Sequence, residues 1–167
     1  MRFVLVVLAL IAAPATAFAQ DHEAAMSRAE SELRDSMAPA GVSVERVAPD
    51  EIRLRMPSDI TFDFNRAEVK REFLPRIHDL SRTLNRNSFM HIAIVGHADA
   101  IGGDDYNQML SERRARSVGA ALMEDGVSYG RIDVSGRGEW EPIASNESEW
   151  GRARNRRVEI RLTSKPK

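Results

Sequence analysis

The stretch that most constrains the fold runs from Val95 to Leu122, where an apolar strand passes through a polar turn into a long helix expected to begin near Asp104. At about 100° per residue, one side of that helix carries a stripe that should face the core. Arg114 falls in the middle of this stripe, so its guanidinium must be paired or must line a polar cavity. The other members of the stripe are Leu110, Ser111, Ala115, Val118, Ala121 and Leu122.

Two further polar side chains should lie near Arg114. Asn107 is on the same side of the helix, about two turns nearer its start. Asp99 comes just after the strand, where open sheets with helical crossovers usually place their binding groups. We therefore expect a carboxylate, an amide and a guanidinium to converge at one place.

The N-terminal residues have the pattern of a secretory signal peptide. Arg2 precedes an apolar run over residues 3–13, which a break at Pro14 and a small-residue ending at 17–19 follow. No stretch reaches the ~18 apolar residues of a transmembrane helix. The sequence holds no cysteine, which argues against disulfides, thiolate metal sites and a lipid on cysteine. We expect a mature chain that begins at Gln20, in the periplasm, without a lipid anchor or a transmembrane segment.

The charges are almost balanced, with 24 basic against 25 acidic residues and a formal net charge of −1. This balance argues against a nucleic-acid partner. Gly136 and Gly138 are not followed by the third glycine and the helix of a nucleotide-binding fingerprint. The two glycines therefore indicate a turn, and we expect no cofactor.

Before the central stretch, residues 20–58 should form a helix and a hairpin that lead into the main domain. A thin apolar stripe over 21–37 predicts a short peripheral helix. Alternating residues on either side of 48–50 predict a hairpin. Ile60, Phe62 and Phe64 continue the alternation, which predicts an extension of the second strand, and Asn65 is a candidate cap for the next helix.

The domain proper should span residues 59–164. Its patterns predict a helix from near Leu74 to Arg86, a strand over 89–95 covered on both faces, the long helix ending at Gly126, a strand over 131–136, a brief helix with Asn146 and Glu149 as capping box, and a strand over 157–163 with one buried and one wet face. After the first strand of the hairpin, the order is β-α-β-α-β-α-β. This order implies an α+β fold (an α/β sandwich), with helices packed on one mixed sheet and no second globular domain.

Residues 60–162 resemble the OmpA-like C-terminal domain, the peptidoglycan-binding module of Gram-negative envelope proteins. One short motif would mean little, but four in the right order and spacing are specific. They are TFDFN at 61–65, GHADxxGxxxYNxxLSxRRAxxV at 96–118, GxGEWEPI at 136–143 and NRRVEI at 155–160.

The resemblance implies noncovalent binding of the peptidoglycan stem peptide, with Asp99 and Arg114 clamping its diaminopimelate, and no catalysis. Family members usually carry threonine where Ala98 stands, so one hydrogen bond of about 1 kcal/mol is missing. Trp140 replaces what is commonly a serine and would add a stacking surface at the rim. The resemblance places supporting contacts at Ala98, Asn107, Asn65, Leu110 and an arginine of the final motif, Arg156 or Arg157.

Three other interpretations stay open at this point. Arg114 and Asp99 could form a purely structural ion pair. His97 and Asp99 could act as an acid–base dyad or as metal ligands in a periplasmic hydrolase, although no further ligand lies at suitable spacing nearby, and His97 is better explained as orienting the turn. Residues 20–58 could dock an envelope protein partner, which would make the chain an adaptor. The arginines at 152–157 fit a solvated surface, because acidic neighbours offset them.

Overall fold

The computed structural model describes residues 15–164, with the side chains of 15–19 excepted. Most of the expected signal peptide therefore lies outside the described residues, and its boundary after residue 19 falls within helix α1 (Ala15–Met37). Within 15–164, no helix is both long and apolar enough to cross a membrane.

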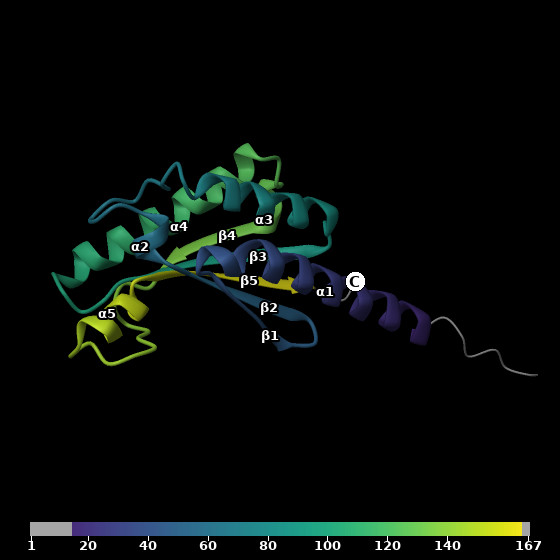
Figure 1. Ribbon diagram of the computed structural model, residues 1–167, viewed down its shortest axis with the longest axis horizontal. Helices are drawn as coiled ribbons and strands as arrows, with labels where there is room; N and C mark the ends of the chain where they lie inside the picture. The colour runs from purple at the N-terminus through teal and green to yellow at the C-terminus, as the bar shows by residue number, and fades with distance from the viewer. Residues whose placement is uncertain (1–14, 165–167) are drawn as a thin grey trace, which may run out of the picture.

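A single five-stranded sheet organises the molecule (Figure 1), in the order β1-β2-β5-β3-β4. Only β3 and β4 pair in parallel; the other neighbours are antiparallel. This arrangement confirms the predicted α+β fold with a mixed sheet. The elements after α1 are η1 (Ala38–Ala40), β1 (Ser43–Ala48), β2 (Glu51–Pro57), α2 (Ser58–Thr61), α3 (Leu74–Arg86), β3 (Met90–His97), α4 (Asp104–Glu124), η2 (Tyr129–Arg131), β4 (Ile132–Gly136), α5 (Glu149–Asn155) and β5 (Arg157–Ser164).

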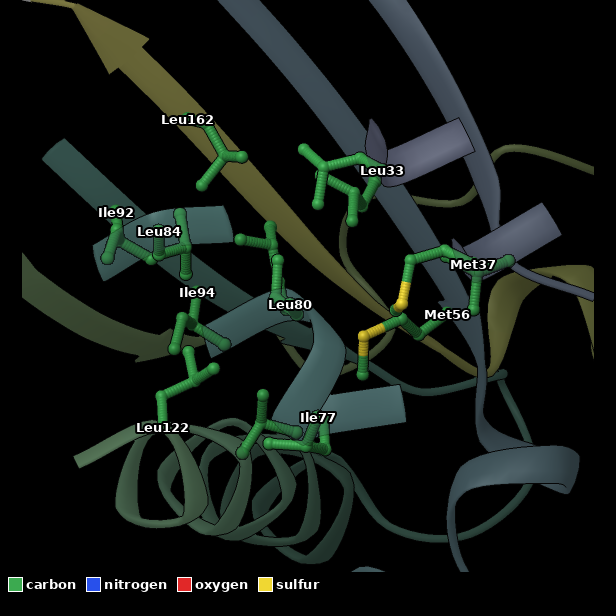
Figure 2. Close-up of a cluster of buried hydrophobic side chains, with 14 of the residues drawn as sticks. Leu33, Met37, Met56, Ile77, Leu80, Leu84, Ile92, Ile94, Leu122 and Leu162 are labelled. Carbon is green, nitrogen blue, oxygen red and sulfur yellow. The ribbon is translucent and has the colours of Figure 1, made fainter. Parts of the chain in front are cut away.

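The hydrophobic core lies between the sheet and the helices α1, α3 and α4. Figure 2 shows side chains from these three helices meeting residues of β2, β3 and β5. The prediction of a peripheral α1 is wrong, because its apolar stripe is fully buried in this core: Met26, Ala29, Leu33 and Met37. Four residues at helical spacing are enough to seat the helix, while its polar residues face solvent.

The other face of the sheet carries polar side chains. The expectation that β3 is covered on both faces is therefore wrong over its first half, where buried and half-buried residues alternate. On β5, Arg157 and Glu159 face this side and are nevertheless buried, with Arg157 Nε donating to Glu159 Oε1 at 2.8 Å. Arg157 also donates to the carbonyl of Glu141, so the loop after β4 covers this end of the face.

Three local predictions near helix ends are also wrong. The chain does not continue as a strand through residues 60–64: α2 forms instead, Phe62 makes a single bridge to Val69, and Phe64 is 98% exposed. Asn65 adopts a left-handed φ of 59° and caps no helix. The side chain that caps α5 is Ser148, which accepts from the amide of Gly151, and not Asn146.

Two glycines let α4 cross directly over the ends of β3 and β4. A Cβ on Gly96 would lie 1.9 Å from the carbonyl oxygen of Ser111, and one on Gly136 would lie 2.5 Å from the Ser111 hydroxyl. That hydroxyl accepts from the amide of Gly138 at 3.0 Å. This close approach fixes where the first turns of α4 stand relative to the strand ends.

Candidate functional site

A cavity of about 630 Å³ opens at the end of β3, between α2, the first half of α4 and α5. It collects seven of the eight residues that the sequence nominated, from segments far apart in the chain. These are Asn65, Ala98, Asp99, Asn107, Leu110, Arg114 and Arg156.

Asp99 lines this cavity and is 7% exposed. Its Oδ1 accepts from the backbone amide of Ile101 at 2.9 Å, and its Oδ2 accepts from Arg156 Nη1 at 2.7 Å. Charge-assisted hydrogen bonds of this length fix the orientation of a carboxylate. Asp99 therefore presents its remaining lone pairs in a fixed direction.

Arg114 lies across the cavity on α4 and is 5% exposed. Its Nε donates to the carbonyl of Arg66 at 3.0 Å, and its guanidinium carbon lies 5.2 Å from the centroid of the Phe62 ring. Burial lowers the pKa of Arg114, while the negative charge of Asp59 acts in the opposite direction. Among residues 15–164, no salt bridge joins Arg114 to Asp99 or to another carboxylate. The structural ion pair is thus not formed, and Arg114 follows the other prediction, of lining a polar cavity.

Arg156 pairs with three carboxylates at the cavity. Its guanidinium binds Asp59 at 3.1 Å, Asp99 at 2.7 Å and Glu149 at 2.8 Å. The hydrogen bond with Asp59, followed by those with Asp99 and Glu149, raises the pKa of Arg156. Arg156 is occupied by these carboxylates, whereas the terminal nitrogens of Arg114 make no hydrogen bond within residues 15–164 and are available to a ligand.

Asn107 braces the turn that carries Asp99. It is 2% exposed, and its Nδ2 donates to the backbone carbonyl of Asp99 at 3.1 Å and to Glu139 Oε2 at 2.7 Å. Both amide hydrogens are therefore used within the protein. The amide of Ala98 donates to the carbonyl of Gly138 at 2.7 Å, which ties the same turn to the loop after β4.

The eighth nominated residue, Arg157, and the expected stacking residue, Trp140, lie elsewhere. Arg157 is on the polar face of the sheet with Glu159 and does not line the cavity, so the choice between the two arginines falls on Arg156. Trp140 is exposed and does not line it either, which contradicts the expected stacking surface at the rim.

His97 is buried and turned away from the cavity. Neither of its ring nitrogens has a hydrogen-bond partner among the described residues, so it forms no dyad with Asp99 and orients no turn by hydrogen bonding. Burial, followed by the charge of Arg157, lowers the pKa of His97 to about 4. Within residues 15–164, no cluster of three or more histidine, aspartate or glutamate side chains is arranged to hold a metal ion.

Sequence reasoning missed several lining residues. Asp59 comes from α2, where the alternation predicts a strand, and it reaches Arg156 across 97 positions of sequence. The Tyr106 hydroxyl donates to the side-chain oxygen of Asn65 across the mouth. Glu149 could have been found, because it stands two helical turns before Arg156 on the predicted brief helix. The other missed lining residues include Phe64, Lys70 and Arg152.

A family model described as the OmpA family matches residues 61–156, more than half of the chain. The chain belongs to the OmpA family. This finding confirms the resemblance that the four sequence motifs carry, and the match includes every lining residue of the cavity except Ser58 and Asp59.

Relatives of this OmpA-family chain include a probable lipoprotein and an outer membrane protein. The probable lipoprotein YiaD of Escherichia coli is 41% identical over 134 residues, which cover 80% of this chain and 61% of that protein. Outer membrane protein A of Bordetella avium is 40% identical over 126 residues, covering 74% of this chain and 63% of that protein. The chain therefore spans less than two thirds of the length of these relatives.

Solved structures of the OmpA-like fold agree with the architecture. A MotB-like protein of Desulfovibrio vulgaris has a TM-score of 0.75 at 25% identity, covering 89% of this chain and 99% of its own. The cell wall anchor of the T6SS from Pseudomonas aeruginosa has a TM-score of 0.70 at 33% identity, covering 80% of this chain and 97% of its own. The peptidoglycan-associated lipoprotein of Burkholderia pseudomallei has a TM-score of 0.58 at 28% identity, covering 62% and 87%.

Proposed function

We propose that this OmpA-family chain is a noncovalent peptidoglycan-binding module of the cell envelope, whose cavity holds the diaminopimelate of the stem peptide. One observation carries the proposal: an acceptor-only carboxylate, Asp99, and a donor-only guanidinium, Arg114, line one cavity without neutralising each other. The names of two structural neighbours, a cell wall anchor and a peptidoglycan-associated lipoprotein, support the same function.

The side chain of diaminopimelate ends in an ammonium and a carboxylate on one carbon. The ammonium is a donor that complements Asp99, and the carboxylate is an acceptor that complements the terminal nitrogens of Arg114. The module then binds by ion pairing and hydrogen bonding and breaks no bond. Ala98 supplies no hydroxyl, so the turn contributes backbone and carboxylate groups only.

Binding to purified peptidoglycan sacculi tests the two principal residues. We expect Asp99→Ala and Arg114→Ala each to abolish sedimentation with sacculi while leaving the circular dichroism spectrum unchanged, because both side chains border an open cavity. Arg113→Ala is the matched control, since the neighbouring arginine is exposed. Undiminished binding of the Arg114 variant would refute the assignment. Unfolding of that variant would instead point to a structural role for Arg114.

Calorimetry with three matched stem peptides tests which peptidoglycan is recognised. Lysine in place of diaminopimelate lacks the second carboxylate and leaves the Arg114 guanidinium unpaired, which costs about 2–5 kcal/mol at an interface. We expect affinity to fall roughly 30-fold or more, at about 1.4 kcal/mol per decade. Amidation of that carboxylate should act likewise. Equal affinity for the lysine and diaminopimelate peptides would exclude the clamp even if sacculi were bound.

We also propose that residues 1–19 are a signal peptide and that the mature chain works in the periplasm on the cell-wall side of the outer membrane, without a lipid anchor. The envelope relatives support this location. Cleavage before Gln20 would leave the buried stripe of α1 intact. Intact-mass measurement of the periplasmic protein checks it, and a membrane-bound species that retains residues 1–19 would contradict it.

A further inference from the structure

A second cavity, of about 710 Å³, is lined by residues of β1, β2 and α5. Helix α5 forms the wall between the two cavities: Glu149 and Arg152 line the first, whereas Trp150 and Arg154 line the second. Asp59 lines both, so the two cavities adjoin. The remaining lining of the second cavity is Gly41, Ser43, Glu45, Arg55, Pro57, Ile143, Ala153 and Arg157.

Trp150 offers an aromatic surface at this cavity. The residue is 69% exposed, although tryptophan is highly buried on average. The guanidinium carbon of Arg154 lies 4.7 Å from the ring centroid, and this contact holds the indole in place. Packing within the domain does not require an indole that is so exposed.

Polar groups stand around this aromatic surface. Arg55 Nη1 donates to Glu45 Oε2 at 2.9 Å, and the Nε of Arg55 faces Glu159 Oε1 at 3.4 Å. Ser43 lies on the neighbouring strand, directly opposite Arg55 in the register. The cavity therefore combines an indole, on which Arg154 stacks, with two carboxylates (Glu45 and Asp59), two further guanidinium groups (Arg55 and Arg157) and the Ser43 hydroxyl.

We propose that this second cavity binds a sugar of the glycan strand that carries the stem peptide. A pyranose has one apolar face of C–H groups, which fits against an indole, and a rim of hydroxyls, which both donate and accept hydrogen bonds. A sugar that carries a stem peptide has no free carboxylate, which suits a cavity whose charged groups are already paired within the protein: Arg55 with Glu45, Arg157 with Glu159 and Asp59 with Arg156. The inference rests on the proposed function, because it extends the same polymer from the first cavity to the second.

The reach of the stem peptide is consistent with both cavities being filled at once. Diaminopimelate is the third residue of the stem, and three extended residues span roughly 10 Å. A helix with its side chains is about 10–12 Å across. A path around α5 would exceed this span, but Asp59 lines both cavities, so a stem whose diaminopimelate lies in the first cavity can pass beside Asp59 and place its sugar in the second.

The test compares the free diaminopimelate tripeptide with the same tripeptide carrying its disaccharide, by calorimetry on the full mature chain. We expect the disaccharide to improve affinity about tenfold, the gain of one aromatic contact with its hydrogen bonds. Trp150→Ala should remove that gain and leave the affinity for the free tripeptide unchanged. Trp140→Ala is the matched control, because Trp140 is 68% exposed and lines neither cavity. Equal affinities of the two ligands, or equal losses with Trp150→Ala, would overturn the proposal.

A second measurement separates this proposal from the binding of diaminopimelate. Glycan oligosaccharides freed of stem peptides, with their lactyl carboxylates capped as methylamides, are titrated to millimolar concentration into the isotope-labelled Asp99→Ala variant. We expect the indole N–H resonance of Trp150 to shift while that of Trp140 stays in place. A Trp150 shift supports the sugar site even if the tripeptide fails to bind. An unshifted Trp150 resonance overturns the sugar site even if the tripeptide binds.

Discussion

Acidification should destabilise this domain at mildly acidic pH, because His97 is buried at the end of β3 without a hydrogen-bond partner for either ring nitrogen among the described residues. Burial lowers the pKa of its imidazole to about 4, from an ordinary value of 6.5. Arg157, Arg161 and Arg137 lower it as well, and only Glu159 acts in the opposite direction. The ring is thus neutral in the folded protein throughout the physiological range.

The sign and size of the effect follow from linkage. Below pH 6.5 the unfolded chain takes up a proton at this histidine and the folded chain does not, so stability falls as pH falls. The contribution is fully present above pH 6.5 and is lost progressively down to about pH 4. At about 1.4 kcal/mol per pH unit, the whole loss is roughly 3 kcal/mol, of which about 2 kcal/mol is lost by pH 5.

Urea unfolding at half-unit steps between pH 7.5 and pH 5 measures this loss. Glu159, whose pKa is lowered, affects stability only below its ordinary value of 4.5, so the slope above pH 5 belongs to His97. His97→Phe keeps an aromatic ring and removes the titration, and it should flatten the curve. The control His78→Gln, at a side chain that is 60% exposed, should keep the wild-type slope. A wild-type curve that is already flat would show that His97 is solvated in the folded protein.

Two further predictions concern the framework of the site. Gly96→Ala should lower the free energy of unfolding by about 3 kcal/mol or more, because its Cβ would meet the Ser111 carbonyl. Gly103→Ala is the control and should not lower it, because no atom lies within 4 Å of the added Cβ. Thermal melts compare the two variants. Asn155→Ala should lower the free energy of unfolding by about 3 kcal/mol, because the backbone amides of residues 143 and 144 donate to the Asn155 side-chain oxygen. Hydrogen exchange at these two amides should become faster. Unchanged exchange would refute this prediction.

The sequence predicted best those features that depend on local periodicity. The helices over 74–86 and 104–124 carry long apolar stripes, and they begin and end where expected. The strand predicted over residues 60–64 is wrong. Three apolar residues at period two also fit a helical turn followed by an exposed loop, which is what the structure has. The thin stripe of α1 indicates a peripheral helix, yet the burial of that stripe depends on partners on α3 and β1 that no local pattern reveals.

The residues of the candidate site also fall into those that local patterns predict and those that they do not. Asp99, Asn107 and Arg114 could be brought together from sequence, because one strand end and one helix face place all three. The hydrogen bond between Asp99 and Arg156 could not be predicted from local patterns, because the two residues are 57 positions apart in the sequence. The contact of Asp59 with Arg156 could not be predicted either, because Asp59 lies on a helical turn where the sequence pattern predicts a strand.

The contacts of Arg156 bear on how the cavity discriminates between ligands. Arg156 offsets part of the negative charge of Asp99, so an ammonium ligand meets a carboxylate that is oriented but already paired. Asp59 and Glu149 share the same guanidinium and add negative charge at its other side. Arg114, by contrast, has no carboxylate partner among the described residues, and burial makes its charge costly. The site therefore gains more by satisfying Arg114 than by satisfying Asp99, which makes the ligand's carboxylate the stronger determinant of specificity.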